Sequence, residues 1–218
     1  MKLSYKTLLF DLDGTLTDSA EGILNCVRYA LDKFGIEETD PVRLNSFIGP
    51  PLYDSFKNLY PQLSEEQVRE AVKIYRSRYK DTCAIENKLY DGIPELIGNL
   101  KAAGYRLCLA TAKPETFALP IMKHFALYDK FDLLYGCDES KNRLNKDDVI
   151  RDIIADNPDM NRDNTVMIGD RFHDVLGAAK SGLDCIGVLY GFGDRAELEG
   201  AGAKYITETV ASLGELFL

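Results

Sequence analysis

The stretch TLLFDLDGT, residues 7–15, decides the fold: a short apolar run ends in two carboxylates, Asp11 and Asp13, which Gly14 and Thr15 follow. A buried strand normally avoids unpaired acids, because taking a carboxylate out of water is costly unless a metal or hydrogen bonds compensate it. Two acids one residue apart repel each other, and a divalent cation relieves that repulsion. Gly14 allows a tight turn and close backbone approach to a ligand. The stretch therefore predicts a catalytic site at the carboxyl end of a central strand.

Length and charge narrow the class of protein. The chain has 218 residues, 45% of them hydrophobic, and a formal net charge of −9. This length predicts one large domain, or a core domain with a smaller insert. The negative charge argues against binding a nucleic acid polymer, which needs a basic face. It does not exclude a small anionic substrate, because a metal and one lysine reverse the local field.

Membrane insertion and secretion are not expected either. No apolar stretch approaches the roughly 20 residues needed to span a bilayer. The apolar run near the N-terminus breaks into acids, unlike a signal peptide. The five cysteines are odd in number and form no C-x-x-C pair, and Cys108 and Cys185 lie in apolar runs as small core residues. We therefore expect a reducing, cytoplasmic setting.

Strand-like and helix-like segments alternate over most of the chain. An alternation of this kind predicts an α/β fold with a Rossmann-like parallel sheet and crossover helices on both faces. Ligands of such sheets bind at the carboxyl ends of the strands. The strand-like runs are 6–11, 105–111, 131–135, 165–170, 185–189 and 204–206; the helix-like segments are 92–104, 113–127, 146–157 and 173–182.

Residues 17–88 differ from the rest because they contain no convincing strand. They are expected to form several helices, at 21–34, 41–47, 52–60 and 64–82, and the last begins with the capping-box pattern Ser64–Gln67. A helical block inserted after the first strand predicts an all-helical cap subdomain. We expect residues 1–16 and 88–218 to form the α/β catalytic core and residues 17–87 to form the cap.

Asp11 is the candidate nucleophile. A carboxylate that attacks phosphorus gives an aspartyl-phosphate and splits a difficult hydrolysis into two easier steps. Asp13 would then protonate the leaving alcohol and later activate water as a general acid and base. The alternative is a solvated acidic turn, which the buried strand before it and the Gly14–Thr15 pair after it disfavour.

Thr111 ends the second strand-like run, in the sequence LCLATAKP. Its hydroxyl could donate a hydrogen bond to a phosphoryl oxygen, helped by backbone N–H groups at the start of the next helix. Taken alone the signal is weak, since a threonine at a strand-to-helix junction is usually an N-cap. Its expected place beside Asp11 in a parallel sheet strengthens the functional interpretation.

Lys146 begins the helix-like segment KDDVIRDII. The helix macrodipole disfavours a cation at this end, so the lysine is a candidate for screening charge between the nucleophile and a phosphoryl group. The acids Asp147 and Asp148 suit the first helical turn and weaken that argument. Lys141 and Arg143 are the competing candidates for this role.

A Gly-Asp pair, Gly169–Asp170, ends the apolar run of VMIGDRFHD, residues 166–174. Asp170 would complete an oxygen-rich Mg²⁺ site with Asp11 and a backbone carbonyl, expected to be that of Asp13. Asp174 is expected to orient Lys146 or a metal-bound water. His173 has no second His or Cys at ligand spacing and is expected to be structural or to line the rim, and His124 is likewise expected to be structural.

Four motifs together resemble the haloacid dehalogenase-like hydrolase superfamily: DLDGT (11–15), Thr111, Lys146 and GDRFHD (169–174). Within it the chain is most similar to the phosphoglycolate phosphatase-like group. The stretches 47–56 and 169–182 are similar to members described as 5′-nucleotidases.

The resemblance implies roles for single residues. It implies that Asp11 is the nucleophile, that Asp13 is the acid and base, and that Thr111 and Lys146 stabilise the phosphate. It also implies that Asp11, Asp13 and Asp170 hold Mg²⁺, and that the helical block is the cap. Two departures stand out: Ala112 replaces a polar residue that often follows the threonine, and Asp147–Asp148 replaces the Lys-Pro that often follows the lysine.

The sequence thus predicts a Mg²⁺-dependent phosphomonoesterase acting on a small soluble phosphate ester, either phosphoglycolate-like or a nucleoside 5′-monophosphate, through an aspartyl-phosphate. A phosphosugar mutase and a catalytically idle binding module are the alternatives; a dehalogenase is less favoured, because Asp13 would have no leaving alcohol to protonate. We expect no membrane or nucleic acid partner, and a monomer or homodimer.

The substrate contacts are expected from Gly14, Thr111, Ala112, Lys146 and Gly49, although the turn at Gly49 could equally be an ordinary helix connection. The leaving group could be read by cations of the cap (Arg43, Lys57, Arg76, Arg78) or by its aromatic residues (Phe47, Tyr53, Phe56).

Overall fold

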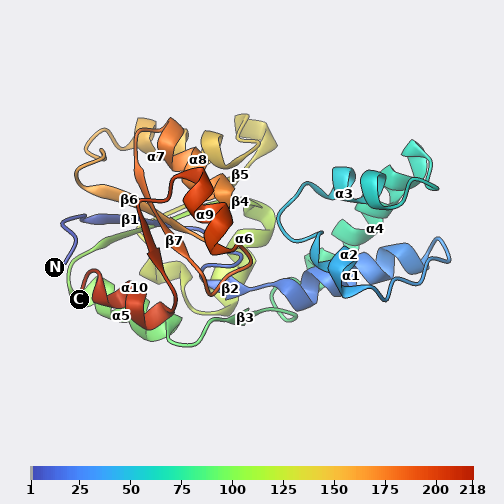
Figure 1. Cartoon of the computed structure of the whole chain (residues 1–218), viewed down its shortest axis with the longest axis horizontal. Coiled ribbons are helices and arrows are strands. Elements are labelled where there is room, and N and C mark those ends of the chain that lie inside the picture. Colours follow the sequence, from blue (N-terminus) through green and yellow to red (C-terminus); the bar gives the residue numbers. More distant parts are fainter. Residues whose placement is uncertain (1) are drawn as a thin grey trace. The chain divides into compact units, whose positions relative to one another are not determined.

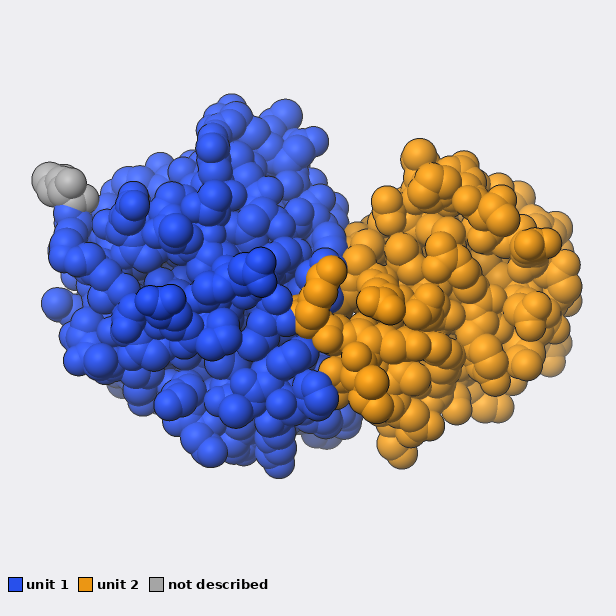
Figure 2. All heavy atoms as spheres, turned by 90° about the horizontal axis from the view of Figure 1, so that it is seen from below, with its two compact units in different colours: residues 1–18, 89–218 blue, residues 19–88 orange. Residues whose placement is uncertain are grey.

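A computed structural model describes residues 2–218. The chain divides into two compact units, which Figure 2 colours separately: residues 1–18 with 89–218, called here the core unit, and residues 19–88, called the helical unit. The core unit is therefore built from two segments that are distant in sequence.

The core unit contains a six-stranded sheet in the order β5-β4-β1-β6-β7-β8, and its paired strands are parallel. Strand β1 lies in the interior of the sheet, with Phe10 beside Leu109 of β4 and Ile168 of β6. The carboxyl ends of these three neighbouring strands consequently lie together. The strands are β1 Thr7–Phe10, β4 Arg106–Pro114, β5 Leu133–Cys137, β6 Thr165–Gly169, β7 Asp184–Val188 and β8 Tyr205–Thr207.

Helices cover both faces of this sheet, as Figure 1 shows for α7 and α8 on one side and α5 and α10 on the other. All four residues of β1 are buried, as expected for a parallel strand covered on both faces. The predicted α/β Rossmann-like fold is confirmed. The helices of the core unit are α5 Ile93–Ala102, α6 Glu115–His124, α7 Lys146–Asp156, α8 Phe172–Lys180, α9 Arg195–Ala201 and α10 Val210–Glu215, with 3₁₀ turns η1 Tyr128–Lys130 and η2 Glu139–Lys141.

The helical unit contains α1 Ala20–Asp32, α2 Pro41–Asn45, α3 Leu52–Leu59 and α4 Glu65–Thr82. The Ser64 side chain accepts a hydrogen bond from Gln67 N, and the Gln67 side chain accepts one from Ser64 N, so the predicted capping box is present. The aromatic rings of Phe47, Phe56 and Tyr60 pack together in its interior.

The structure corrects several sequence predictions. Residues 17–88 were expected to contain no strand, but Thr17–Asp18 (β2) and Lys88–Leu89 (β3) pair as a short two-stranded sheet. Two residues are too few to produce an alternating pattern. Strand β4 does not end at Thr111 but continues to Pro114, with a shift of register after Ala110. The short helices α9 and α10 were not predicted.

Two further sequence predictions concern the cysteines and the absence of a membrane-spanning helix. All five cysteines are free, and Cys108 and Cys185 are buried. Among residues 2–218, no helix has the length and apolar character required for a membrane crossing.

Candidate active site

Asp11 directly follows β1 and extends its pairing, since its N–H donates to the carbonyl of Ile168 at 3.0 Å. Its side chain is 13% exposed, and its Oδ1 lies 2.8 Å from Nζ of Lys146. The acid therefore lies at the end of a buried strand, next to a cation.

Lys146 begins α7 and turns its ammonium into the core unit, where the side chain is only 4% exposed. Nζ lies 2.8 Å from Asp11 Oδ1 and 2.7 Å from Asp174 Oδ1, and it donates to the Ala110 carbonyl at 2.8 Å. These three partners use all three N–H bonds of the ammonium. Burial acts to lower the pKa of Lys146, but Asp11 and Asp174 outweigh it and raise that pKa, so the lysine is charged. The competing cations, Lys141 and Arg143, pair with Glu115 and Asp138 instead.

Asp174 lies in the first turn of α8 and is 1% exposed. One of its oxygens contacts Lys146, and Oδ2 accepts a hydrogen bond from Arg171 N at 3.1 Å. Burial raises the pKa of Asp174 to about 6, against the opposing effect of Lys146. Asp174 was expected to orient either Lys146 or a metal-bound water, and in the structure it contacts Lys146.

Asp11, Asp170 and Asp174 form an acidic cluster whose ligand atoms all lie within 4.8 Å of one another, and which could hold a metal ion. Asp170 is fully buried; its Oδ2 accepts a hydrogen bond from Phe192 N at 2.7 Å, while its Oδ1 has no hydrogen-bonding partner among the described residues. Burial, together with the charges of Asp174 and Asp11, raises the pKa of Asp170 well above its usual value. A buried oxygen without a partner among several carboxylates fits a divalent cation with oxygen ligands. Asp13, whose expected contribution is a backbone carbonyl, is not among these side chains.

Three glycines allow the chain to close tightly around Asp170. Gly14 has φ +80, and a Cβ there would lie 2.0 Å from Asp170 Oδ2. A Cβ on Gly191 would lie 2.2 Å from the Gly14 carbonyl, and one on Gly193 would lie 2.0 Å from the Asp170 carbonyl. The loop 190–193 after β7 was not predicted to belong to the site. The sequence feature that could have identified this loop is the pair of glycines, Gly191 and Gly193, on either side of Phe192 shortly after a buried strand.

Asp13 pairs with a lysine that the sequence reasoning also missed. Lys113 Nζ lies 2.6 Å from Asp13 Oδ2, and the lysine side chain is 7% exposed. The second oxygen, Oδ1, is buried and has no hydrogen-bonding partner among residues 2–218. The signal that could have found Lys113 is its place two residues after Thr111, in the same strand.

Thr111 and Ala112 precede this lysine in β4. Thr111 is buried, and its Oγ1 accepts a hydrogen bond from Lys113 N at 3.2 Å. The alternative role of Thr111 as a helix cap is wrong, because the N-cap of α6 is Pro114 and makes no side-chain cap. Ala112 is exposed. His173 and His124 are also exposed, each with its ring against a neighbouring phenylalanine.

The residues expected to read the leaving group lie in the helical unit. Phe47 and Phe56 are 2% and 0% exposed, so the expectation that they offer an aromatic platform is wrong; they form the interior of that unit. Gly49 is exposed with φ +107. Arg43 pairs with Glu38, Arg78 with Glu86 and Lys57 with Glu65, while Tyr53 is half-buried and Arg76 is exposed.

The parallel α/β core thus carries, at its strand ends, a cluster of carboxylates beside the buried Lys146 that could hold a metal ion. The family model described as haloacid dehalogenase-like hydrolase matches residues 8–188. The chain therefore belongs to the haloacid dehalogenase-like hydrolases, as the motifs predicted.

Individual relatives are similar over nearly the whole chain, and their names include phosphatases and one kinase. A 5′-nucleotidase of Pseudomonas aeruginosa is 43% identical over 98% of this chain and 96% of that protein. A tyrosine-protein kinase PtkA of Mycobacterium tuberculosis is 35% identical over 98% of this chain and 72% of that protein. A phosphoglycolate phosphatase of Colwellia psychrerythraea is 29% identical over 98% and 97%. The structure of a haloacid dehalogenase-like family hydrolase of Streptococcus pneumoniae is similar with a TM-score of 0.88 at 33% identity, covering 96% and 97% of the two chains. The predicted enzyme class, a phosphatase of this family, is confirmed.

Proposed function

We propose that the protein is a Mg²⁺-dependent phosphomonoesterase that hydrolyses a small phosphate ester through an aspartyl-phosphate on Asp11. The observation that carries this proposal is the position of Asp11 at the end of β1, 2.8 Å from a buried, charged Lys146. A carboxylate held in one orientation by a cation is a suitable nucleophile toward phosphorus. The lysine also supplies positive charge where the equatorial phosphoryl oxygens would lie.

The reaction follows from these positions in two steps. Lys146 holds Asp11 Oδ1, so Oδ2 attacks phosphorus while the bond from phosphorus to the leaving oxygen breaks. Asp13 donates a proton to the leaving alcohol, and in the second step it takes a proton from the water that hydrolyses the aspartyl-phosphate. Thr111, buried at 1% exposure beside the same strand ends, contributes a hydroxyl donor to the phosphoryl oxygens.

Asp11, Asp170 and the backbone carbonyl of Asp13 are the groups that would hold Mg²⁺. The orphaned Asp170 Oδ1 and the all-oxygen donor set support this choice. When bound, the ion neutralises charge between the nucleophile and the phosphoryl group. Asp174 is already engaged by Lys146 and Arg171 N, so we assign it to positioning that lysine.

A nucleoside 5′-monophosphate is the favoured substrate class, because the 43% identical relative is named a 5′-nucleotidase. Phosphoglycolate is the second candidate, on the strength of a relative at 29% identity. The five free cysteines support a reducing, cytoplasmic setting. We expect a monomer or homodimer with no nucleic acid polymer or membrane partner.

The test is release of inorganic phosphate from nucleoside 5′-monophosphates and from phosphoglycolate, with Mg²⁺ and with EDTA. We expect activity that requires Mg²⁺ and no bisphosphate activator, since a mutase would need the activator. Asp11→Asn should lower kcat at least about a thousandfold. Removing the nucleophile disables the whole group of catalytic residues that act together with it. Acid-quenched wild-type enzyme should carry phosphate on Asp11.

The matched control is Asp129→Asn, which removes one exposed acid in a turn of the core unit and should leave turnover unchanged. Full activity of Asp11→Asn, or activity that EDTA does not reduce, contradicts the proposal.

A further inference from the structure

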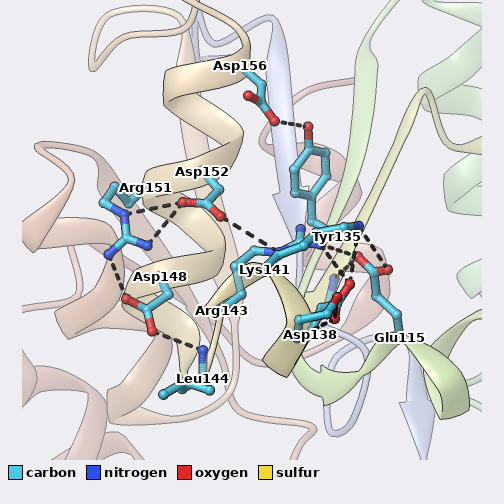
Figure 3. Close-up of polar contacts among 12 residues, drawn as sticks. Glu115, Tyr135, Asp138, Lys141, Arg143, Leu144, Asp148, Arg151, Asp152 and Asp156 are labelled. Carbon is cyan, nitrogen blue, oxygen red and sulfur yellow. Dashed lines mark hydrogen bonds and ion pairs between the residues drawn. The ribbon is translucent and has the colours of Figure 1, made fainter.

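Three acidic side chains converge on the guanidinium of Arg143, which Figure 3 shows between α6 and α7. The arginine side chain is only 3% exposed. Its Nη2 lies 2.7 Å from Glu115 Oε1 and 3.9 Å from Asp138 Oδ2, and its Nε lies 3.7 Å from Asp152 Oδ2. The centre of the guanidinium also lies 5.0 Å from the ring centroid of Tyr135. We call Arg143, Glu115, Asp138 and Asp152 the arginine clasp.

The members of the clasp come from separate elements of the core unit. Glu115 begins α6, Asp138 directly follows β5, and Asp152 lies within α7. Two backbone hydrogen bonds also close the loop from Asp138 to Arg143. Asp138 N donates to Arg143 O at 2.9 Å, and Arg143 N donates to Asp138 O at 3.1 Å. The arginine therefore joins the start of α6, the loop after β5 and the middle of α7.

The position of the clasp in the chain links it to the phosphate-binding residues. Arg143 precedes Lys146 by three residues, and Glu115 follows Thr111 by four. Glu115 Oε1 also accepts a hydrogen bond from Gly136 N at 3.4 Å. Two ion pairs thus connect Glu115, in the segment after Thr111, to the loop before Lys146: a close one with Arg143 at 2.7 Å and a longer one with Lys141 at 3.7 Å.

Stability alone is a poor reason for this arrangement. Burying an arginine requires desolvation that an ion pair does not always repay, and an apolar side chain of similar size often serves stability as well. Arg143 Nε is buried and has no hydrogen-bonding partner among the described residues. Arg151, two turns further along the chain, pairs with Asp148 and Asp152 while its side chain stays 57% exposed. Arg151 therefore forms its ion pairs while remaining exposed, whereas Arg143 forms its ion pairs while buried. Ion pairing alone does not require the burial of Arg143.

We infer that Arg143 is a positioning residue for phosphoryl binding: its ion pair with Glu115 fixes the loop from Asp138 to Asn145, so that Lys146 enters the site aligned with Asp11. This inference rests on the proposed function. Lys146 must keep its contacts with Asp11 and Asp174 while its charge acts on the incoming phosphoryl group, so a small displacement of its helix end lowers transition-state stabilisation. The clasp thereby acts on the reaction without touching the substrate.

The experiment compares Arg143→Gln with Arg151→Gln, which removes a neighbouring arginine that shares Asp152 as a partner. Binding of inorganic phosphate in the presence of Mg²⁺ is measured by calorimetry, and kcat and KM are measured separately with one phosphate ester. For Arg143→Gln we expect about tenfold weaker phosphate binding and about tenfold lower kcat, the range typical of residues that orient a site. Arg151→Gln should change both by less than twofold.

Further variants separate positioning from simple loss of stability. Glu115→Gln should change phosphate binding and kcat in the same direction as Arg143→Gln, and the double variant should lose less than the sum of the two single changes, because the two residues share one ion pair. Arg143→Lys keeps the charge but loses the planar fork, so it should restore only part of the phosphate affinity. If Arg143→Gln fails to fold, Glu115→Gln and Arg143→Lys carry the same comparison.

A lowered melting temperature with unchanged phosphate affinity and kcat in Arg143→Gln and Glu115→Gln would overturn the inference, since the clasp would then be purely structural. Failure of the proposed function is distinguishable: it shows in the wild-type enzyme, which would release no phosphate. Failure of the inference shows only in the comparison between the clasp variants and Arg151→Gln.

Discussion

At the scale of single residues, the two carboxylates that follow β1 are each held by a lysine of their own. Asp11 lies 2.8 Å from Lys146 and Asp13 lies 2.6 Å from Lys113. The two lysines come from different elements, α7 and β4. Each of the two acids therefore has its own cation within ion-pair distance.

Replacing Lys113 with methionine is expected to impair the acid and base function that we propose for Asp13. Without the ion pair the Asp13 carboxylate is free to rotate away from the leaving oxygen, so kcat should fall by about tenfold for an alkyl phosphate. An aryl phosphate, whose leaving group needs little protonation, should be affected much less. Steady-state kinetics with one ester of each kind measure the difference.

Lys123→Met, which removes an exposed lysine of α6, is the matched control and should leave both rates unchanged. An equal loss with both esters would contradict the assignment, because it would place Lys113 on the phosphoryl group rather than on the proton-transfer step.

The residues that the sequence predicts at this site are those that end or begin an element. Asp11, Thr111 and Asp170 lie at or near the ends of neighbouring parallel strands, and Lys146 begins a helix, so their proximity follows from the topology. Phe192 N, which binds Asp170, lies in a loop whose approach depends on glycines far apart in sequence. Single-sequence patterns describe local periodicity and do not encode such contacts between loops.

At the scale of elements, long amphipathic segments are predicted more reliably than short ones: the five-residue α2 was expected at 41–47, but α9 and α10 were not expected. The capping box at Ser64 and the periodicity after it predicted α4 within one residue of its observed start. Helix α9 has only seven residues, and its start signal is confined to Asp194, whose side chain accepts a hydrogen bond from Glu197 N. The extension of β4 beyond Thr111 depends on pairing of Pro114 with Cys137 of β5, which is a tertiary contact.

The capping box gives a prediction for the helical unit. Ser64→Ala removes the oxygen that accepts from Gln67 N, and it should lower the free energy of unfolding by about 1 kcal/mol. Ser77→Ala, at an exposed position inside the same helix, is the matched control and should be neutral or slightly stabilising, because alanine has the higher helix propensity. Thermal denaturation followed by circular dichroism compares the two variants. Equal effects of the same sign would show that the cap does not determine the start of α4.

At the scale of the whole core unit, segments from both ends of the chain meet around one carboxylate. Asp184, at the start of β7, is 6% exposed and accepts hydrogen bonds from Tyr5, Arg162 and Lys204. Burial acts to raise the pKa of Asp184, but these three donors outweigh it and lower that pKa. Burial and the contact with Asp184 together raise the pKa of Tyr5 to about 12. The charged form of Asp184 therefore joins the N-terminal segment to the segments that lead into β6 and β8.

Asp184→Asn should consequently lower stability in a pH-dependent way. At pH 7 we expect a loss of about 1–3 kcal/mol, the usual contribution of hydrogen bonds to a charged group. The pKa of Asp184 in the folded state is below its unfolded value of about 3.9. The stabilisation by charged Asp184 is therefore complete above that unfolded value, and it is lost as the pH falls through the folded-state pKa. Denaturant titrations should therefore give a constant difference between wild type and variant from pH 7 to about pH 5, and a smaller one below about pH 4. Asp163→Asn, at an exposed position nearby, should show neither effect. A difference that persists unchanged at the acid end would mean that the neutral side chain holds these segments together equally well, and that the charge of Asp184 is not what joins them.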